Sequence, residues 1–563
     1  MEVMPSMRAM MTAGAALDRC NVGAYNCAYL PVDSPRSFDE AMYILMCGTG
    51  VGFSVEEKYV SQLPRITEEF EHTDTTIHVE DSKEGWAKSL RELITLLIAG
   101  RIPRWNTSRV RPAGDRLVTF GGRASGPEPL ERCFEFCVRL FKNARGRRLT
   151  TLECHDLMCM IADVVVVGGV RRSAMISLSD LGSESMAKAK SGSWWESHVY
   201  RQLANNSAVY NGKPEIGEFL KEWKELYDSK SGERGIFNRD ASKRIVERLG
   251  KRDPNFEFGT NPCSEIILRP FQFCNLTEVI VRPEDDLGSL KRKVRLAAIL
   301  GTIQSTFTNF KYLRKIWQRN TEEERLLGVS LTGIADNLEL FNGKIDLNEL
   351  RQVAIDTNKE WADRLGINPS CAVTCVKPSG TVSQLVNSAS GIHPRWGNYY
   401  LRTVRNDVKD PITKFLQDAG IPWEPDSRNP SAVVFAFPQR APKASVVRSD
   451  VGSLAFLEIW KNFQENWCEH KPSVTISVAE DEWLDVASWC YRNFDILSGV
   501  SFLPFDPTEY PQAPYQTLTK EQYEDWLSKM PGPLDWSKLT DYEHDDHTTG
   551  SQEYACVGGV CEI

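Results

Sequence analysis

The segment 261–265, Asn-Pro-Cys-Ser-Glu, puts the thiol of Cys263 two residues from the carboxylate of Glu265, and its proline stiffens the backbone. A nearby negative charge raises the pKa of a thiol, so the pair is poorly suited to nucleophilic catalysis. It suits a sulfur that exchanges hydrogen atoms while the carboxylate carries a proton. The alternative is a buried loop cysteine beside a solvated glutamate, and the pentapeptide alone favours that alternative.

Two other cysteines could serve the same site. The chain has 15 cysteines, and most of them must fill the core, since unpaired cysteine is among the most buried residue types. Cys274 follows Cys263 by eleven residues, and Cys27 lies near the N-terminus. Each alone is more often a core residue, and their spacing cannot show whether the fold brings them together.

The chain ends in a second pair, Cys556 and Cys561, separated by Val-Gly-Gly-Val. A cysteine pair in a polar tail can close a small disulfide ring and exchange it with an interior pair and an external reductant. The alternatives are an adventitious pair or a metal site. Zinc would need two more ligands, and His544 and His547 are the nearby candidates. The placement favours the disulfide shuttle.

A candidate phosphate cradle lies in 377–384, Lys-Pro-Ser-Gly-Thr-Val-Ser-Gln, between a predicted strand and a short helix. Gly380 permits close backbone approach, and a helix start offers free N–H groups. The hydroxyls come from Ser379, Thr381 and Ser383. A plain strand-to-helix turn is equally consistent with the segment.

Two further patterns fail on context. The segment 48–52, Gly-Thr-Gly-Val-Gly, resembles a dinucleotide loop but follows a predicted helix rather than a strand. The segment 545–550, Asp-Asp-His-Thr-Thr-Gly, matches a cobalamin-ligand pattern. That pattern belongs to a dedicated domain, and only 13 residues follow the segment here, which is too few for such a domain. Neither pattern supports a function here.

The elements that position these residues alternate between helical and extended patterns, which predicts α/β architecture. Helices are expected at 38–46, 81–100 (capped by Asp81 and Glu84), 130–143, 213–228, 291–309, 322–342, 348–365, 454–466, 481–493 and 520–530. Extended segments are expected at 162–178, 371–377, 432–437 and 473–478. After Pro504 the chain becomes rich in Pro, Asp, Tyr and Thr.

Composition narrows the function classes. The 563 residues are 41% hydrophobic and 25% charged, as in ordinary globular proteins. A net charge of −9 argues against a nonspecific nucleic-acid binder. The sequence contains no apolar run long enough to span a bilayer and no signal-peptide pattern, so we expect a cytoplasmic protein without membrane contact.

Taken together, the motifs resemble the catalytic subunit of ribonucleotide reductases, most closely the monomeric adenosylcobalamin-dependent (class II) ribonucleoside-triphosphate reductases. The matching segments run from about Tyr25 to the last residue, and as a set they are highly specific. They are Asn26-Cys27, Gly121–Pro127, Gly169–Ser173, Asn205–Ser207, Asn261–Glu265, Cys274, Pro378–Thr381 and Cys556 with Cys561.

The resemblance implies a ten-stranded α/β barrel with a central finger loop carrying Cys263, plus a flexible C-terminal redox tail. Residues 26–504 would form the barrel, with a specificity-site insertion at about 59–150. Residues 505–530 would form the C-terminal barrel edge and 531–563 the tail. Residues 1–25 would be a short lead-in without the cone domain of some reductases, so we expect no general inhibition by dATP.

The resemblance also implies a mechanism. Adenosylcobalamin generates a thiyl radical on Cys263, which takes the 3′-hydrogen of the ribonucleotide. Glu265 accepts the proton of the 3′-hydroxyl, and Asn261 holds that hydroxyl. The 2′-hydroxyl leaves as water, and Cys27 with Cys274 supplies the electrons. Cys556 and Cys561 then reduce the resulting disulfide and are recharged by thioredoxin or a glutaredoxin-like protein.

Binding partners follow from the same resemblance. The substrates would be ribonucleoside triphosphates, or diphosphates, held by Ser379, Gly380, Thr381 and Ser383. Deoxynucleotide effectors of this allosteric enzyme would bind near Arg171 and Arg172. The insertion favours a monomer, and no metal site is expected.

Two rival functions remain. A class I-type subunit would take its radical from a second protein through adjacent tyrosines. The matching stretch, Ser498–Pro504, has no tyrosine, and the adjacent pair Tyr399-Tyr400 lies elsewhere. The other rival is a cysteine-rich metal-binding or redox-sensing protein, which tight zinc content without nucleotide binding would favour.

Overall fold

The computed structural model describes residues 1–115, 124–166, 174–427, 432–505 and 512–543, together with the backbone of 556–557 and 560–561. Within these residues, no helix is both long and apolar enough to cross a membrane.

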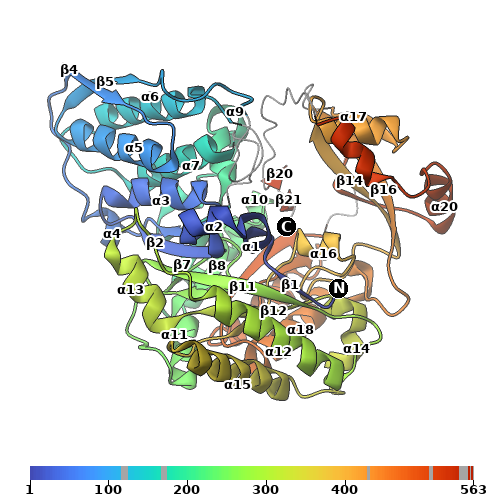
Figure 1. Cartoon of the computed structure of the whole chain (residues 1–563). Helices are drawn as coiled ribbons and strands as arrows, with labels where there is room; N and C mark the ends of the chain where they lie inside the picture. The colour runs from blue at the N-terminus through green and yellow to red at the C-terminus, as the bar shows by residue number, and fades with distance from the viewer. Residues whose placement is uncertain are drawn as a thin grey trace.

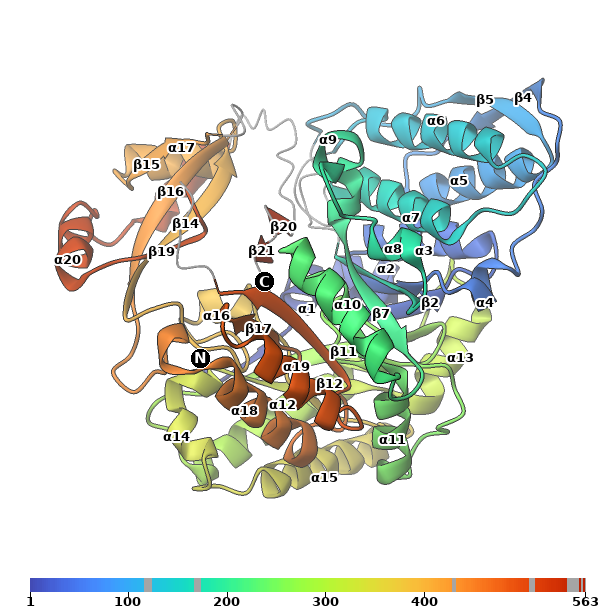
Figure 2. The same cartoon turned by 180° about the vertical axis from the view of Figure 1, so that it is seen from behind.

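Ten strands form an α/β barrel made of two parallel halves, which occupies the lower centre of Figures 1 and 2. One half has the order β2-β3-β6-β7-β8, with the bounds Cys27–Pro31, Gly50–Ser54, Met175–Asp180, Ala204–Tyr210 and Gly235–Asn238. The other has the order β11-β12-β13-β17-β18, with the bounds Gln272–Ile280, Leu327–Thr332, Thr374–Cys375, Thr475–Val478 and Gly499–Pro504.

The two halves meet antiparallel at both seams, β2 with β11 and β8 with β18. Within the second half, β13 joins β17 through a parallel bridge between Val376 and Pro472, which closes the ring. A ten-stranded α/β barrel is therefore confirmed. Strands β2, β11 and β12 are buried along their whole length, as expected for strands covered on both faces.

Helices surround this barrel and shield it from solvent. Below the second half in Figure 1, α12 and α15 pack together. In Figure 2, α18 and α19 lie beside β17, and their apolar side chains join those of β17 and β18 in one buried cluster. Inside the barrel, a smaller apolar group joins Tyr29, Ile176, Leu178, Phe237 and Leu276 to three cysteines. The covering helices are α3 (Arg36–Met46), α10 (Ile216–Ser229), α11 (Arg239–Leu249), α12 (Leu287–Gln304), α13 (Lys315–Glu324), α15 (Leu347–Leu365), α18 (Ser453–Asn466) and α19 (Trp483–Arg492).

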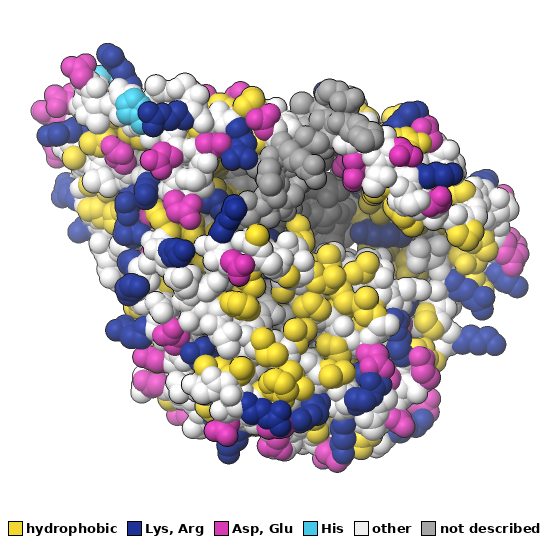
Figure 3. Space-filling view, viewed as in Figure 1, with side chains coloured by type: hydrophobic (Ala, Val, Ile, Leu, Met, Phe, Trp, Pro, Cys, Tyr) yellow, Lys and Arg dark blue, Asp and Glu magenta, His cyan; other side chains and the backbone are white. Residues whose placement is uncertain are grey.

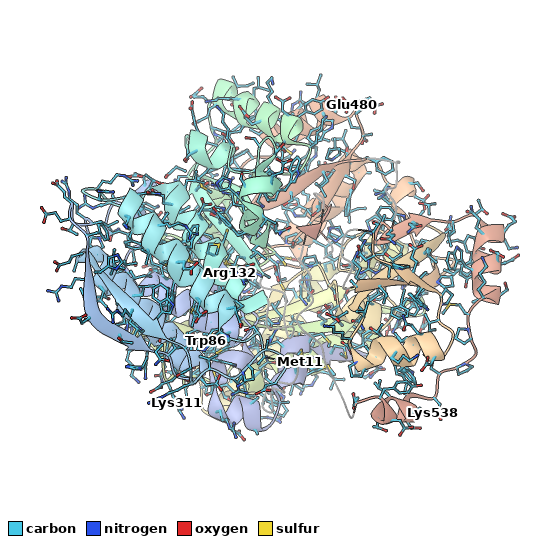
Figure 4. The ribbon with its side chains drawn as sticks, turned by 90° about the horizontal axis from the view of Figure 1, so that it is seen from above. Met11, Trp86, Arg132, Lys311, Glu480 and Lys538 are labelled. Atoms are coloured by element: carbon cyan, nitrogen blue, oxygen red, sulfur yellow. The ribbon has the colours of Figure 1, made fainter. Side chains whose placement is uncertain are left out.

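A lobe formed by residues 57–166 packs on the β2–β3 side of the barrel. It contains α4 (Glu57–Val60), β4 (Glu71–His78), α5 (Lys83–Ile98), β5 (Arg101–Asn106), α6 (Glu128–Asn143) and α7 (Thr151–Val166). Helix α5 is capped by Ser82, which accepts a hydrogen bond from Gly85, rather than by the predicted Asp81. Seen from above, Trp86 and Arg132 mark this lobe on one side of the molecule and Lys538 marks the opposite side (Figure 4).

Two predicted elements are wrong. The helix expected at 322–342 is the end of α13 followed by strand β12, with Arg325 at a φ of 42° between them. The extended segment expected at 162–178 begins as the end of α7, and the strand starts at Met175. Each run contains a short, mostly apolar stretch, and such a stretch fits a buried helix or a buried strand equally well.

A four-stranded sheet stands apart from the barrel, in the order β15-β16-β14-β19. Its strands are Trp423–Pro425, Ala432–Arg440, Tyr399–Asp407 and Tyr515–Thr517. Helices α17 (Pro411–Asp418) and α20 (Lys520–Ser528) accompany it. Residues 515–528 therefore belong to this sheet and do not form the barrel edge predicted for 505–530. Leu534, Leu539 and Tyr542 pack on its apolar cluster.

Candidate active site

Cys263 lies in a hairpin between the short antiparallel strands β9 (Gly259–Thr260) and β10 (Ile267–Leu268). The amide of Ser264 donates to the carbonyl of Asn261, 2.9 Å away, so residues 261–264 form a β-turn. Pro262 occupies the second position of that turn, where its fixed φ is favoured. Cys263 is half-buried, whereas Asn261 and Glu265 are buried.

Glycines in the barrel strands make room for this hairpin. A Cβ at Gly52 would lie 1.7 Å from the Thr260 carbonyl oxygen, and one at Gly50 would lie 2.8 Å from Pro262 Cγ. On another strand, β18, a Cβ at Gly499 would lie 2.9 Å from Ser264 Oγ. The hairpin therefore lies inside the barrel. The glycines of 48–52, which match no dinucleotide loop, permit the close contact with β3.

Cys27 and Cys274 are direct partners across the antiparallel seam between β2 and β11. Side chains of such partners have Cβ atoms about 4.5–5.5 Å apart, close to the separation that a disulfide needs. Burial raises the pKa of both thiols well above the ordinary value, and the charge of Glu265 adds to the effect. Both sulfurs are therefore neutral thiols at physiological pH.

Glu265 is almost wholly buried, and its Oε2 atom has no hydrogen-bond partner among the described residues. Burial raises its pKa, while a hydrogen bond from Asn261 and the charges of Lys377 and Lys471 partly offset that rise. An unpartnered buried carboxylate oxygen is costly, and a bound polar group would relieve the cost. The carboxyl is thus placed to accept or return a proton inside the barrel.

Two lysines of the second barrel half face this carboxyl: Lys377, which is partly buried, and Lys471, which is fully buried. Lys377 pairs with Glu278, with Nζ 2.9 Å from Oε1. Lys471 donates from Nζ to Ser264 Oγ at 3.0 Å and lies 4.6 Å from the centre of the Phe237 ring. Desolvation lowers the pKa of Lys471 to about 7. Sequence reasoning missed Lys471, because a charged residue before a strand carries no signal of its own.

A fourth barrel cysteine, Cys375, belongs to the same group and was also missed. It is fully buried on β13, and it is close enough to Glu265, Cys274 and Cys27 for a charge on any of these groups to affect the others. A Cβ at Gly328 would lie 3.0 Å from its sulfur. Only the tertiary arrangement distinguishes Cys375 from the cysteines of the outer core.

The predicted cradle forms a loop that leads into α16 (Val382–Leu385). Ser379 and Ser383 are buried and bond to each other: the Ser383 amide donates to Ser379 Oγ at 3.1 Å, and Ser383 Oγ donates to the Ser379 carbonyl. Their hydroxyls therefore shape the loop. Thr381, which is exposed, and the partly exposed Gly380 are the members open to a ligand.

The two tail cysteines lie on a pair of short antiparallel strands, β20 (Cys556–Val557) and β21 (Val560–Cys561). Cys556 is the direct register partner of Cys561 in this pair. Both Figures 1 and 2 show this hairpin above the barrel, between the 57–166 lobe and the β14–β16 sheet. Figure 3 shows the described surfaces of those two parts as separate projections, at the upper left and the upper right of the molecule. Arg171 and Arg172, predicted to bind the effector, lie outside the described residues. Within the described part, no three His, Cys, Asp or Glu side chains gather as metal ligands.

Comparison with known proteins yields close matches over nearly the whole chain. The adenosylcobalamin-dependent ribonucleoside-triphosphate reductase of Lactobacillus acidophilus is 28% identical, over 92% of this chain and 79% of its own. That of Lactobacillus leichmannii is 28% identical, over 93% and 79%. A crystal structure of a B12-dependent (class II) ribonucleotide reductase matches with a TM-score of 0.82 at 24% identity, covering 96% of this chain and 87% of the other. No family model matches the sequence.

Proposed function

We propose that this chain, a homologue of the adenosylcobalamin-dependent ribonucleoside-triphosphate reductases, reduces ribonucleoside triphosphates to 2′-deoxyribonucleoside triphosphates by radical chemistry at Cys263. One observation carries the proposal. The barrel gathers four groups that are scattered in the sequence: Cys27 and Cys274 as strand partners, and Cys263 and Glu265 on the hairpin beside them. The chemistry of reduction needs this combination of a hydrogen-atom carrier, a proton carrier and a dithiol.

The proposed cofactor is adenosylcobalamin, which supplies, when bound, the radical that removes the hydrogen atom of Cys263. The residues fit this role in one respect: Cys263 has exposed surface, whereas Cys27, Cys274 and Glu265 are buried. Gly50 is partly exposed and adjoins Pro262, and the partly exposed Asn26 accepts a hydrogen bond from the Gly50 amide, so both would line the approach to that sulfur.

The chain's own residues would then carry out the reduction. The Cys263 sulfur takes the 3′-hydrogen of the substrate and returns it at the end. Glu265 holds the 3′-hydroxyl proton, assisted by Asn261, while the 2′-hydroxyl leaves as water. Cys27 and Cys274 give two electrons and two protons and become a disulfide, so a ribonucleotide and a dithiol yield a deoxyribonucleotide, a disulfide and water. High thiol pKa values suit this step, because no thiolate is required.

The remaining assignments extend the proposal. The loop of Ser379, Gly380, Thr381 and Ser383 would hold the triphosphate through backbone amides and the Thr381 hydroxyl. Arg171 and Arg172 would contact a deoxynucleotide effector. Thioredoxin or a glutaredoxin-like protein would recharge the tail, and the chain would act as a monomer.

An assay of each ribonucleoside di- and triphosphate, with and without adenosylcobalamin, tests the function. With a dithiol as reductant and no second protein, we expect deoxynucleotide formation from triphosphates only when adenosylcobalamin is present. Turnover that requires a separate radical-generating protein would identify the class I-type alternative. Tight zinc content without nucleotide binding would refute the proposal altogether.

Replacing both tail cysteines, Cys556→Ser with Cys561→Ser, tests the shuttle. We expect about one deoxynucleotide per chain from the prereduced enzyme and no sustained turnover with thioredoxin, because the interior disulfide could not be exchanged outward. A small dithiol that reaches the interior pair directly should restore part of the turnover, which serves as the control. Unimpaired thioredoxin-driven cycling in this variant would contradict the role of the tail.

A further inference from the structure

We propose that Lys471 is a positioning residue that holds the tip of the Cys263 hairpin from the opposite half of the barrel. Its effect on turnover rests on the proposed function, whereas its effect on the hairpin does not. Lys471 lies just before β17, which is five strands from β3 in the ring of ten. The hairpin is thus packed against β3 on one side and tethered by Lys471 on the other.

The contacts of Lys471 converge on the hairpin. Its Nζ donates to Ser264 Oγ at 3.0 Å and to Thr260 Oγ1 at 3.4 Å. Its backbone amide donates to the carbonyl of Glu265 at 2.9 Å. The residue before it, His470, accepts the Ile267 amide at Nδ1 and lies 3.0 Å from the Leu327 carbonyl through Nε2. Residues 470–471 therefore bind both strands of the hairpin, at Thr260 and Ile267, and its turn, at Ser264.

Lys471 differs in what it binds from Lys293, which is also buried, and from Lys377, which is partly buried. Lys293 pairs with Asp285 at 2.6 Å and Lys377 pairs with Glu278 at 2.9 Å. Among the ion pairs of the described residues, none includes Lys471; its polar side-chain partners are two hydroxyls, although it is fully buried. The charge of Glu265 partly favours the ammonium, but no carboxylate of the described residues forms an ion pair with it, and such burial is unfavourable. A residue kept there despite that cost is expected to serve the hairpin rather than general stability.

The backbone of the hairpin explains why its tip needs an anchor. Ser264 has a φ of 64°, a left-handed conformation that non-glycine residues rarely adopt. Such residues persist where the surroundings hold them, as at catalytic sites. Cys263 precedes Ser264 and Glu265 follows it, so an anchor on the Ser264 hydroxyl fixes the directions of both reacting side chains. Gly499 leaves the space in which this hydrogen bond forms.

The test compares Lys471→Met, Ser264→Ala, their double variant and Lys293→Met as the matched control. In each full-length chain, without cofactor or nucleotide, the rate of iodoacetamide alkylation at Cys263 is measured by peptide mass spectrometry. We expect faster alkylation in Lys471→Met and in Ser264→Ala, by about fivefold or more, and no further increase in the double variant, because both changes break one interaction. Lys293→Met should alkylate at the parental rate.

Turnover gives the second measurement. A displacement of about 1 Å costs roughly 100-fold in rate, so kcat should fall by about that factor in Lys471→Met while KM changes little. Unchanged Cys263 alkylation in both single variants, or additive effects in the double variant, would overturn the positioning role. An inactive parental enzyme would instead refute the proposed function, and the alkylation rates would still decide the role of Lys471.

Discussion

The Cys263→Ser variant is expected to retain less than about 0.1% of the parental rate of deoxynucleotide formation, equivalent to a barrier increase of at least about 4 kcal/mol. The physical reason is that the Cys263 sulfur is the atom that exchanges hydrogen with the substrate, and a serine hydroxyl holds its hydrogen too strongly to do so. Fold and nucleotide binding should survive, because serine is nearly isosteric and this side chain is only half-buried.

Cys371→Ser is the matched control for this prediction. Cys371 is also half-buried. It packs against the apolar group inside the barrel that contains Cys27 and Cys274, but it takes no part in the proposed chemistry. Its replacement should preserve kcat. Cys27→Ser gives a useful contrast, because it should block reduction while leaving the hydrogen-exchange step at Cys263 intact. Substantial turnover by Cys263→Ser, measured with saturating adenosylcobalamin and dithiol, would show the assignment of the radical site to be wrong.

Gly52→Ala is expected to lower kcat by about 100-fold or more. The new methyl would lie 1.7 Å from the Thr260 carbonyl oxygen and 3.2 Å from Ile176 Cγ2. The first contact involves backbone of the hairpin, so relief requires moving the strand that leads to Cys263. Misplacement by about 1 Å is enough for a rate loss of that size, and overpacking should also cost about 1–3 kcal/mol of stability.

Gly217→Ala separates this steric effect from a general effect of the substitution. Gly217 lies in helix α10, is exposed, and has no atom within 4 Å of an added Cβ. Alanine there should leave kcat unchanged and should not destabilise the helix, because alanine has a higher helix propensity than glycine. Thermal unfolding and kcat should be measured for both variants. Parental kcat in Gly52→Ala would mean that the hairpin does not depend on close contact with β3.

The amino-acid sequence by itself determined the parts of this protein that depend on local chemistry. Helices with clear apolar spacing, such as 347–365, were predicted within a residue or two. The segment Asn261–Glu265 showed by itself that its thiol suits hydrogen-atom exchange better than thiolate chemistry, although the pentapeptide alone favoured a buried loop cysteine. In these cases the neighbours that matter are within a few residues along the chain.

The tertiary structure decided what depends on distant neighbours. The apolar run 327–332 became a barrel strand rather than part of a helix because burial on both faces removes the alternation that would distinguish the two. Cys27 and Cys274 became partners only through the antiparallel seam between the barrel halves. Lys471 reaches Ser264 across 207 residues of sequence. Spacing along the chain carries no information about such pairs, because the order and register of the barrel strands set them.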